Sequence, residues 1–345
     1  GTYSLKSGSI VHSQTSCVSL TQTTIAGPLV FYYKTSSESS DNLKFYLDGS
    51  INKTASGTTS SSWTRYSATV PSSGSHTFKW CYEKDSSSSS GSDAVWIDEI
   101  LMPLELKTIS SVSLGLSYTC AIDNSSTVTC WGSGGQGGLG NGSTSNQSTP
   151  VSVSGISTAT SVSTGHYTSC AVLSSGTVKC WGEGGSGQLG NGSTSDQSTP
   201  VSVSGISTAT SVSTGYRHTC AVLSGGTVKC WGEGGSGQLG NGSTSDQSTP
   251  VSVSGISTAT SVSAGYDHTC AVLSGGTVKC WGDAGYGRLG NGSTWPDQTS
   301  PVSVSGISTA TSVSSGTYHN CALLSGGTIK CWGYGYYGQL GNGST

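Results

Sequence analysis

The chain has 345 residues and a formal net charge of −3, and only 9% of its residues are charged, against roughly 25% in an average soluble protein. Lys and Arg form no cluster, so the electrostatic footprint of a nucleic-acid-binding protein is absent. No run of 18 apolar residues occurs, and the sequence therefore predicts no membrane-spanning helix.

The first hundred residues contain short segments of alternating polar and apolar residues. Leu29–Tyr33, Leu43–Leu47 and Tyr66–Val70 are examples, and alternation at this density is typical of a β-sandwich. Two further segments, Trp80–Asp85 and Gly91–Ile100, resemble the closing segments of jelly-roll modules in large surface and secreted proteins. The resemblance implies a jelly-roll sandwich over residues 1–102. Modules of this shape include carbohydrate-binding and adhesive proteins, so it also implies a possible glycan ligand.

After residue 115, a stretch of about 50 residues recurs five times. Each copy contains two cysteines separated by nine residues, then Trp-Gly and a Gly-rich loop that ends in Leu-Gly-Asn-Gly-Ser-Thr. Within one copy, the sequence predicts strands at Ala159–Val162, Cys170–Leu173, Thr177–Trp181 and Val201–Val203. Four short strands per copy, repeated at this period, indicate stacked blades in which each unit buries its apolar face against its neighbour.

The cysteine spacing predicts disulfides. A three-residue loop ending at Gly176 pairs Leu173 with Thr177 and, counting outward, Cys170 with Cys180. Directly opposed residues on antiparallel strands lie about 4.5–5.5 Å apart, which a disulfide accepts, whereas nine intervening residues do not suit a zinc site. The twelve cysteines therefore predict six disulfides in an oxidising compartment: Cys17–Cys81, Cys120–Cys130, Cys170–Cys180, Cys220–Cys230, Cys270–Cys280 and Cys321–Cys331.

The repeat resembles that of the regulator of chromosome condensation family, through residues 218–232, 237–242 and 250–253. The resemblance covers roughly residues 105–345 and implies a β-propeller. The predicted fold is thus all-β: a jelly-roll sandwich (1–102), then a propeller (103–345) with five visible four-stranded blades. Either the segment Pro103–Leu106 closes a five-bladed ring, or further blades lie beyond Thr345. The nucleotide-exchange activity of the founding member is not carried over, because no basic tail or exchange wedge is present.

Eight Asn-x-Ser/Thr sequons are candidate glycosylation sites, and five of them fall at the same point of the repeat. They are Asn52, Asn124, Asn141, Asn146, Asn191, Asn241, Asn291 and Asn342. Asn-Gly is also a turn signal, so a purely structural role remains the alternative for the repeated sites.

Aromatic residues near Gly or Pro are candidate contacts for sugars or another subunit: Trp63, Trp295, Tyr334, Tyr336 and Tyr337. The three tyrosines occupy the loop that reads Gly-Gly-Ser-Gly in the middle copies, which points to the last blade as a contact face. No cofactor is expected; the alternative is a calcium ion held by acidic residues, namely Asp85, Asp93 and Asp98, with Glu99 beside them.

No catalytic constellation is evident. His218, His268 and His319 each precede a cysteine by two residues, but Tyr118 and Thr168 occupy the same position in the first two copies. A catalytic or metal-binding role would not tolerate such replacements, so we expect these side chains to form hydrogen bonds within their blade. No Gly-x-Ser-x-Gly elbow is joined to a suitable His and Asp.

The predicted function is that of a non-enzymatic, extracellular structural or adhesive protein. It would belong to a cell-surface coat or a filamentous appendage such as a flagellar hair, with other surface proteins or copies of itself as partners. Residues 170–213 and 220–263 differ only at Ser175 and Gly225, so the blades offer one contact repeatedly rather than one dedicated pocket. The alternatives are a secreted lectin-like module that binds glycans and a non-catalytic part of a larger secreted hydrolase.

Overall fold

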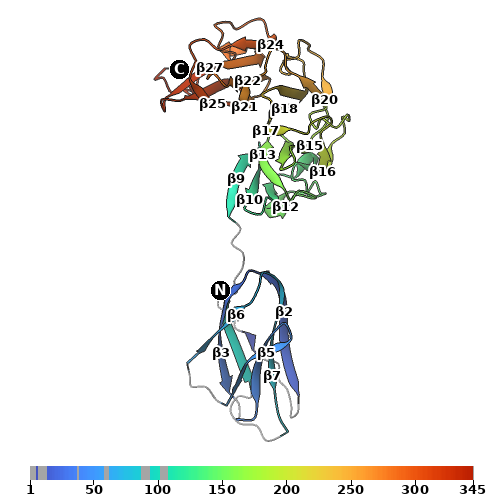
Figure 1. The fold of residues 1–345 in the computed structure, drawn as a ribbon, viewed down its shortest axis with the longest axis vertical. Helices are drawn as coiled ribbons and strands as arrows, with labels where there is room; N and C mark the ends of the chain where they lie inside the picture. Colours follow the sequence, from blue (N-terminus) through green and yellow to red (C-terminus); the bar gives the residue numbers. More distant parts are fainter. Residues whose placement is uncertain are drawn as a thin grey trace. The chain divides into compact units, whose positions relative to one another are not determined.

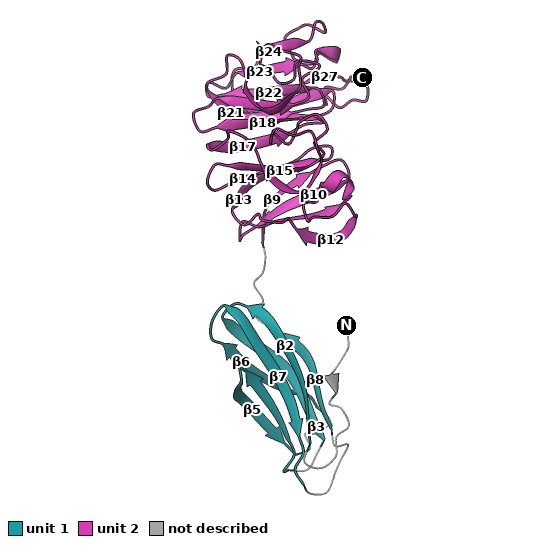
Figure 2. Cartoon of the chain, turned by 90° about the vertical axis from the view of Figure 1, so that its right-hand side faces the viewer, with its two compact units in different colours: residues 1–106 teal, residues 107–345 magenta. Residues whose placement is uncertain are grey.

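The computed structural model describes residues 5–6, 14–36, 39–57, 62–86, 94–101 and 108–344. The chain divides into two units, Gly1–Leu106 and Lys107–Thr345 (Figure 2). The boundary expected from the sequence falls at residues 102–103, outside the described residues. Strands dominate both units, and the only helical turns in the described ranges are η1 (Gly135–Gly137) and η2 (Gly285–Gly287). No helix among these residues is long and apolar enough to cross a membrane.

The first unit contains two four-stranded antiparallel sheets with interleaved connections. One sheet has the order β1 (Leu5–Lys6), β8 (Ala94–Leu101), β3 (Gly27–Ser36), β6 (Thr64–Val70); the other has the order β2 (Thr15–Thr24), β7 (Gly74–Glu83), β4 (Asn42–Leu47), β5 (Ser50–Ser56). Alternate residues of each strand point inward, as Leu43, Phe45 and Leu47 do in β4. They pack in one core with Phe31 and Trp80, so the two sheets share a hydrophobic interior.

The second unit is a series of antiparallel sheets with consecutive strand order, each formed by one sequence repeat. The strands are β9 (Ile109–Leu114), β10 (Tyr118–Asp123), β11 (Val128–Gly132) and β12 (Gln147–Ser152) in the first blade; β13 (Ala159–Thr164), β14 (Thr168–Leu173), β15 (Val178–Gly182) and β16 (Gln197–Ser202) in the second; β17 (Ala209–Thr214), β18 (His218–Leu223), β19 (Val228–Gly232) and β20 (Gln247–Ser252) in the third; β21 (Ala259–Ala264), β22 (His268–Leu273), β23 (Val278–Gly282) and β24 (Gln298–Ser303) in the fourth; and β25 (Ala310–Ser315), β26 (His319–Leu324) and β27 (Ile329–Gly333) in the fifth.

This arrangement confirms the predicted propeller blades, with two differences. The fifth sheet has three described strands rather than four, and the described residues of this blade extend to Ser344. The fourth strand of the second blade begins at Gln197 and includes Pro200, instead of starting after it. Proline is tolerated there because the strand lies at the edge of its sheet, next to a register shift.

The hairpin register agrees with the sequence prediction. Cys170 opposes Cys180, and the Leu173 N–H donates to the Thr177 carbonyl at 2.9 Å. Gly176 has a φ of +78°, the left-handed conformation that the third loop position requires. All six predicted disulfides are formed, each with a Cα–Cα distance of 4.1 Å.

Neighbouring blades are joined by a tryptophan that inserts into the preceding blade. Trp231 is fully buried against Leu189 and Val203, and its Nε1–H donates to the Gln188 carbonyl at 2.8 Å. The indole therefore combines a large apolar contact with a satisfied polar group. Trp181 and Trp281 make the same contact in their blades.

The glycine of Leu-Gly-Asn-Gly makes this close approach possible, and the repeat supplies a matched control. Gly190 has a φ of +68°, and a Cβ there would lie 2.7 Å from Nε1 of Trp231; Gly205 has a similar φ of +64° with no atom within 4 Å. We expect Gly205→Ala to cost about 1 kcal/mol through backbone strain alone, and Gly190→Ala about 2–4 kcal/mol because overpacking is added. Guanidinium unfolding of both variants measures the difference, and equal losses would contradict the packing described.

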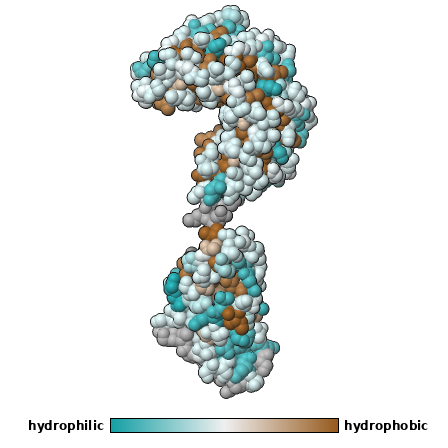
Figure 3. All heavy atoms as spheres, in the orientation of Figure 1, coloured by the Kyte–Doolittle hydropathy of each residue, from teal (hydrophilic) through white to brown (hydrophobic). Residues whose placement is uncertain are grey.

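The five blades follow an open arc in the described residues (Figure 1). Pro103–Leu106, the candidate closing strand, lies outside those residues. The first blade exposes Ile109, Val112, Leu114 and Leu116, each by more than half, and Figure 3 shows hydrophobic side chains gathered on this blade at the opening of the arc. The last blade exposes Leu323 and Ile329, as well as three tyrosines: Tyr318, Tyr336 and Tyr337.

Candidate binding surface

A row of aromatic rings follows the turns between the first and second strands of successive blades. Tyr216 stacks on Tyr266 with ring centroids 4.0 Å apart, His166 lies 4.6 Å from Tyr216, and Tyr318 lies 6.1 Å from Tyr266. His166, Tyr216 and Tyr266 occupy the same position of the turn and Tyr318 the next one, so the repeat brings these rings onto one face of the second unit. The row leads into a group of tyrosines at the fourth and fifth blades.

This tyrosine group lines a cavity of about 680 Å³, within the size range of small-molecule sites. Tyr266 and Tyr318 come from first-to-second-strand turns, Tyr286 from the loop after β23, and Tyr334 and Tyr337 from the segment after β27. The Tyr286 and Tyr334 ring centroids lie 4.7 Å apart. Tyr286 also has a φ of +60°, an uncommon conformation for a large residue that is often found at functional sites.

Charged side chains complete the cavity wall. The buried Arg288 places Nη1 3.2 Å from Oδ2 of Asp283, donates from Nε to the Gly285 carbonyl, and lies over the Tyr318 ring at 4.9 Å. Asp267 also faces the cavity. Burial and the nearby carboxylates Glu233 and Asp283 raise the pKa of Asp267 to about 6, although Arg288 and Arg217 act in the opposite direction.

The predicted contact aromatics separate into three places. Tyr334 and Tyr337 line the cavity, and Tyr336 stacks on Tyr334 beside it. Trp295 is 77% exposed and does not line the cavity. Trp63 belongs to the first unit, where it lines a separate hollow of about 260 Å³ with Tyr32, Asp98 and Glu99. Sequence reasoning missed Asp267, Tyr286, Arg288 and Tyr318, although each departs from the residue at its position in the preceding blade.

The repeated sequon asparagines form local turns. In each of these asparagines, Oδ1 accepts the backbone N–H of the serine two residues later, at 3.1 Å. The asparagines are Asn141, Asn191, Asn241, Asn291 and Asn342. Oδ1 of Asn146 instead accepts the Gly134 N–H. These contacts bear out the turn role and use Oδ1 rather than Nδ2, the atom that carries sugar. Glycosylation stays a prediction, as it does at Asn52 and Asn124.

The described residues provide no support for the predicted calcium site. Among them, no group of three His, Cys, Asp or Glu side chains is placed to hold a metal ion. Oδ1 of Asp98 accepts the Glu99 N–H, and the Asp85 N–H donates to Asp41. Asp93 lies outside the described residues.

The blade histidines are structural, but they connect neighbouring blades rather than bonding within one. Nε2 of His218 lies 2.8 Å from Oγ1 of Thr269, which itself donates to the Gln238 carbonyl. His218 is therefore the donor to Thr269. His268 makes the same bond to Asn320 Oδ1 in the next blade. The expectation of bonds within a blade was wrong for His218 and His268, whose side chains lie on the face that the next blade covers. It is confirmed for Thr168, whose Oγ1 donates to the Glu183 carbonyl of the same blade.

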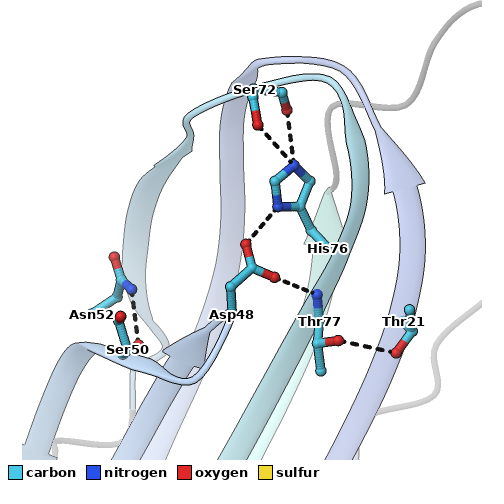
Figure 4. A network of polar contacts seen from close by, with 7 residues as sticks. All are labelled: Thr21, Asp48, Ser50, Asn52, Ser72, His76 and Thr77. Atoms are coloured by element: carbon cyan, nitrogen blue, oxygen red, sulfur yellow. Dashed lines mark hydrogen bonds and ion pairs between the residues drawn. The ribbon is translucent and has the colours of Figure 1, made fainter.

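A serine, a histidine and an aspartate also meet in the first unit (Figure 4). His76 Nδ1 lies 2.6 Å from Asp48 Oδ2, and its Nε2 lies 2.9 Å from the Ser72 carbonyl and 3.5 Å from Ser72 Oγ. Since both ring nitrogens face acceptors, these contacts favour the protonated imidazole. The hydrogen bond to Asp48 is the largest cause of the raised pKa of His76. An imidazolium cannot accept the Ser72 proton, so this network clamps a turn instead of activating a nucleophile.

These histidines predict opposite pH responses of the two units. The pKa of His76 is raised, so its contribution to stability is complete below its unfolded value of about 6.5 and is lost as pH rises through the folded value. Burial lowers the pKa of His218 to about 3 and that of His268 to about 4. The second unit therefore loses stability as pH falls below about 6.5, on the order of 2 kcal/mol per histidine at pH 5, partly offset by protonation of Asp267.

Differential scanning calorimetry of the whole chain between about pH 5 and about pH 8 checks this prediction. We expect one transition to rise and the other to fall on acidification, and His76→Gln to flatten the response of the first unit alone. Two transitions that shift in the same direction would contradict the assigned histidine charges.

The sheets, their consecutive order and the contacts between blades define a β-propeller repeat protein. The model of the RCC1-like domain family matches residues 39–345, so the chain belongs to that family. The match begins inside the first unit, whereas the propeller strands begin at Ile109. No curated protein sequence matches the chain significantly.

Solved structures show the same fold. Human WBSCR16 is 21% identical with a TM-score of 0.62, over 71% of this chain and 68% of that protein. Prp20p from Saccharomyces cerevisiae is 23% identical with a TM-score of 0.57, over 68% of this chain and 60% of that protein. Yeast RCC1 (Prp20) in its complex with Kap60 is 22% identical with a TM-score of 0.56, over 68% of this chain and 59% of that protein. The chain thus spans about three fifths of the yeast protein, and at these identities the likeness concerns the fold.

Proposed function

We propose that this protein is a non-enzymatic, extracellular structural or adhesive component that assembles with copies of itself through the exposed faces of its end blades. We also assign the first unit as a jelly-roll module, on the basis of its two interleaved four-stranded sheets. The six disulfides, with no free cysteine, favour an oxidising extracellular location.

The exposed faces of the end blades carry the assembly proposal. Leu323 and Ile329 of the last blade are 42% and 67% exposed, whereas their counterparts in the fourth blade, Val272 and Val278, are 1% exposed under the next blade. In the first blade, Val112 is 60% exposed, although its counterpart Val162 is 9% exposed. Within residues 108–344, the first and last blades therefore each present the face that a neighbouring blade covers elsewhere.

These two faces are complementary, because the interior interfaces join the same two kinds of face. The last blade of one copy can therefore accept the first blade of another. Such a head-to-tail contact does not use the same patch twice, so it extends into rings or filaments. A coat or filamentous appendage is a natural product of this geometry, and the low surface charge adds little repulsion between copies.

Light scattering of the purified chain tests this assembly. We expect concentration-dependent oligomers that Ile329→Lys abolishes, because a charge would be buried in the contact. Ser325→Lys adds the same charge on the same blade at an exposed turn position and should leave assembly unchanged. A monomer at every concentration, or equal effects of the two substitutions, would reject the proposal.

Glycan binding by the first unit is the second candidate. It is favoured by the hollow beside Trp63, where an indole and two carboxylates, Asp98 and Glu99, offer stacking and hydrogen bonding to a sugar. Glycan-array binding that Trp63→Ala abolishes would support this function. Binding that Trp63→Ala leaves unchanged would exclude this hollow as the glycan site.

A further inference from the structure

The tyrosine cavity contains a carboxylate that no protein cation neutralises directly. Arg288 is paired with Asp283 and held by the Gly285 carbonyl. The Asp267 carboxylate makes no ion pair or side-chain hydrogen bond to the residues that the structure describes. The cavity wall therefore carries a surplus negative charge, surrounded by tyrosine rings.

The sequence differences between blades are concentrated on this wall. Across residues 259–294 the fourth blade differs from the third, residues 209–244, at six positions. Four of the six line the cavity: Asp267, Asp283, Tyr286 and Arg288. Their counterparts in the third blade are Arg217, Glu233, Ser236 and Gln238. The repeat folds with either set, so folding alone does not require the residues that form the cavity.

We propose that this cavity binds an organic ammonium cation, with its charge against Asp267 and its alkyl groups against the faces of the surrounding tyrosines. Tyrosine faces attract cations through their ring quadrupole, most strongly where water is excluded. The cavity already shows this preference, because the Arg288 guanidinium lies 4.9 Å from the Tyr318 centroid and 5.7 Å from the Tyr286 centroid. A neutral ligand would desolvate Asp267 without compensating its charge.

The ammonium group could be quaternary, as in choline, or primary, as in a lysine side chain. A quaternary group relies on ring faces, whereas a primary one also needs hydrogen-bond acceptors, which Asp267 and Asp283 supply. The experiment therefore uses choline and n-butylammonium as separate probes. The neutral isostere of choline, 3,3-dimethylbutan-1-ol, isolates the contribution of charge at constant shape.

Calorimetric titration of the whole chain measures these affinities. We expect at least one of the two cations to bind about tenfold or more tightly than the neutral alcohol. Asp267→Asn should reduce binding of that cation about tenfold. Tyr337→Ser should also weaken it, and this substitution installs the residue that the chain already uses at Ser186 and Ser236. Asp196→Asn removes a carboxylate of the second blade that does not line the cavity and installs the residue present at Asn146; it is the matched control and should have no effect.

Two further measurements separate charge recognition from damage to the fold. Arg288→Gln, the residue of Gln188 and Gln238, removes the competing cation and should tighten binding, whereas a disrupted cavity would bind less. Choline affinity should fall from about pH 8 to about pH 5 as Asp267 is protonated, and Asp267→Asn should abolish that dependence. The other charged groups near Asp267 are Glu233, Asp283, Arg217, Arg288 and His319, so His319→Gln should retain it.

Three results would overturn the inference. Equal binding of the alcohol and both cations would show that charge is not recognised. Tighter binding of neutral methyl glycosides, lost in Tyr337→Ser, would assign the cavity to a glycan. The absence of binding by either cation at tens of millimolar, about the weakest affinity that such a site allows, would remove the site altogether.

Discussion

Trp231→Ala is expected to destabilise the second unit by about 3–5 kcal/mol, because the truncation leaves a large cavity between two blades. The indole is fully buried between the second and third blades, and its Nε1–H satisfies the Gln188 carbonyl. Since each blade contacts only its neighbours, the loss should be local and should make unfolding less cooperative. Guanidinium unfolding followed by circular dichroism measures it.

The first blade provides the control for this prediction. Trp131 has the same position in its repeat but is only half-buried in the described residues, so Trp131→Ala should cost clearly less than Trp231→Ala. Trp231→Phe keeps a ring and removes the hydrogen bond, and should cost about 1–2 kcal/mol. A loss below about 1 kcal/mol for Trp231→Ala would refute the packing between blades.

Removal of the Cys220–Cys230 disulfide is the second large effect. In the loop-entropy model, a cross-link with a sequence separation of 10 stabilises by about 3 kcal/mol, and one with a separation of 64 by about 4 kcal/mol. The double substitution Cys220→Ala with Cys230→Ala should therefore destabilise the second unit by about 3 kcal/mol. The replacement of both Cys17 and Cys81 by alanine should destabilise the first unit more.

Thermal unfolding of the two double variants, compared unit by unit, tests the entropic account. A larger loss from the short-loop pair would show that the packing of these buried sulfurs, rather than loop closure, dominates. In either case the blades have few large apolar residues, so the cross-link is a substantial part of the stability of each.

The sequence predicted the blade well because its constraints are local. The offset of ten residues between Cys170 and Cys180, together with Gly176 at the third loop position, defines a hairpin register that the structure confirms. The strand at Gln197 was predicted too short, because Pro200 signals a strand boundary and the sequence does not reveal that it lies on an edge strand.

The candidate site was only partly predictable because its residues come from two blades. Tyr334 and Tyr337 stood out because they lie in a loop that reads Gly-Gly-Ser-Gly in the middle copies. Asp267 and Arg288 belong to no motif that the sequence analysis identified, and only the packing of the fourth blade against the fifth places them around one cavity. The signal that could have found them was the comparison of adjacent repeats, in which the fourth blade changes at clustered positions against a nearly constant background.

The hydrogen-bond partner of His218 was also mispredicted because it belongs to another blade. From sequence, His218 has a strand neighbour on either side, and a bond within the blade is the simplest expectation. The structure shows that its partner, Thr269, lies in the next blade. Residues about 50 positions apart in the sequence come into direct contact once the blades stack. No local sequence pattern indicates such a contact.

Electron cryo-microscopy of the purified, oxidised chain tests the central claim most directly. The account predicts ordered chains of particles in which the last blade of one copy, through Leu323 and Ile329, covers the first blade of the next. Isolated single arcs at high concentration, or particles joined through other surfaces, would contradict assembly through the end blades.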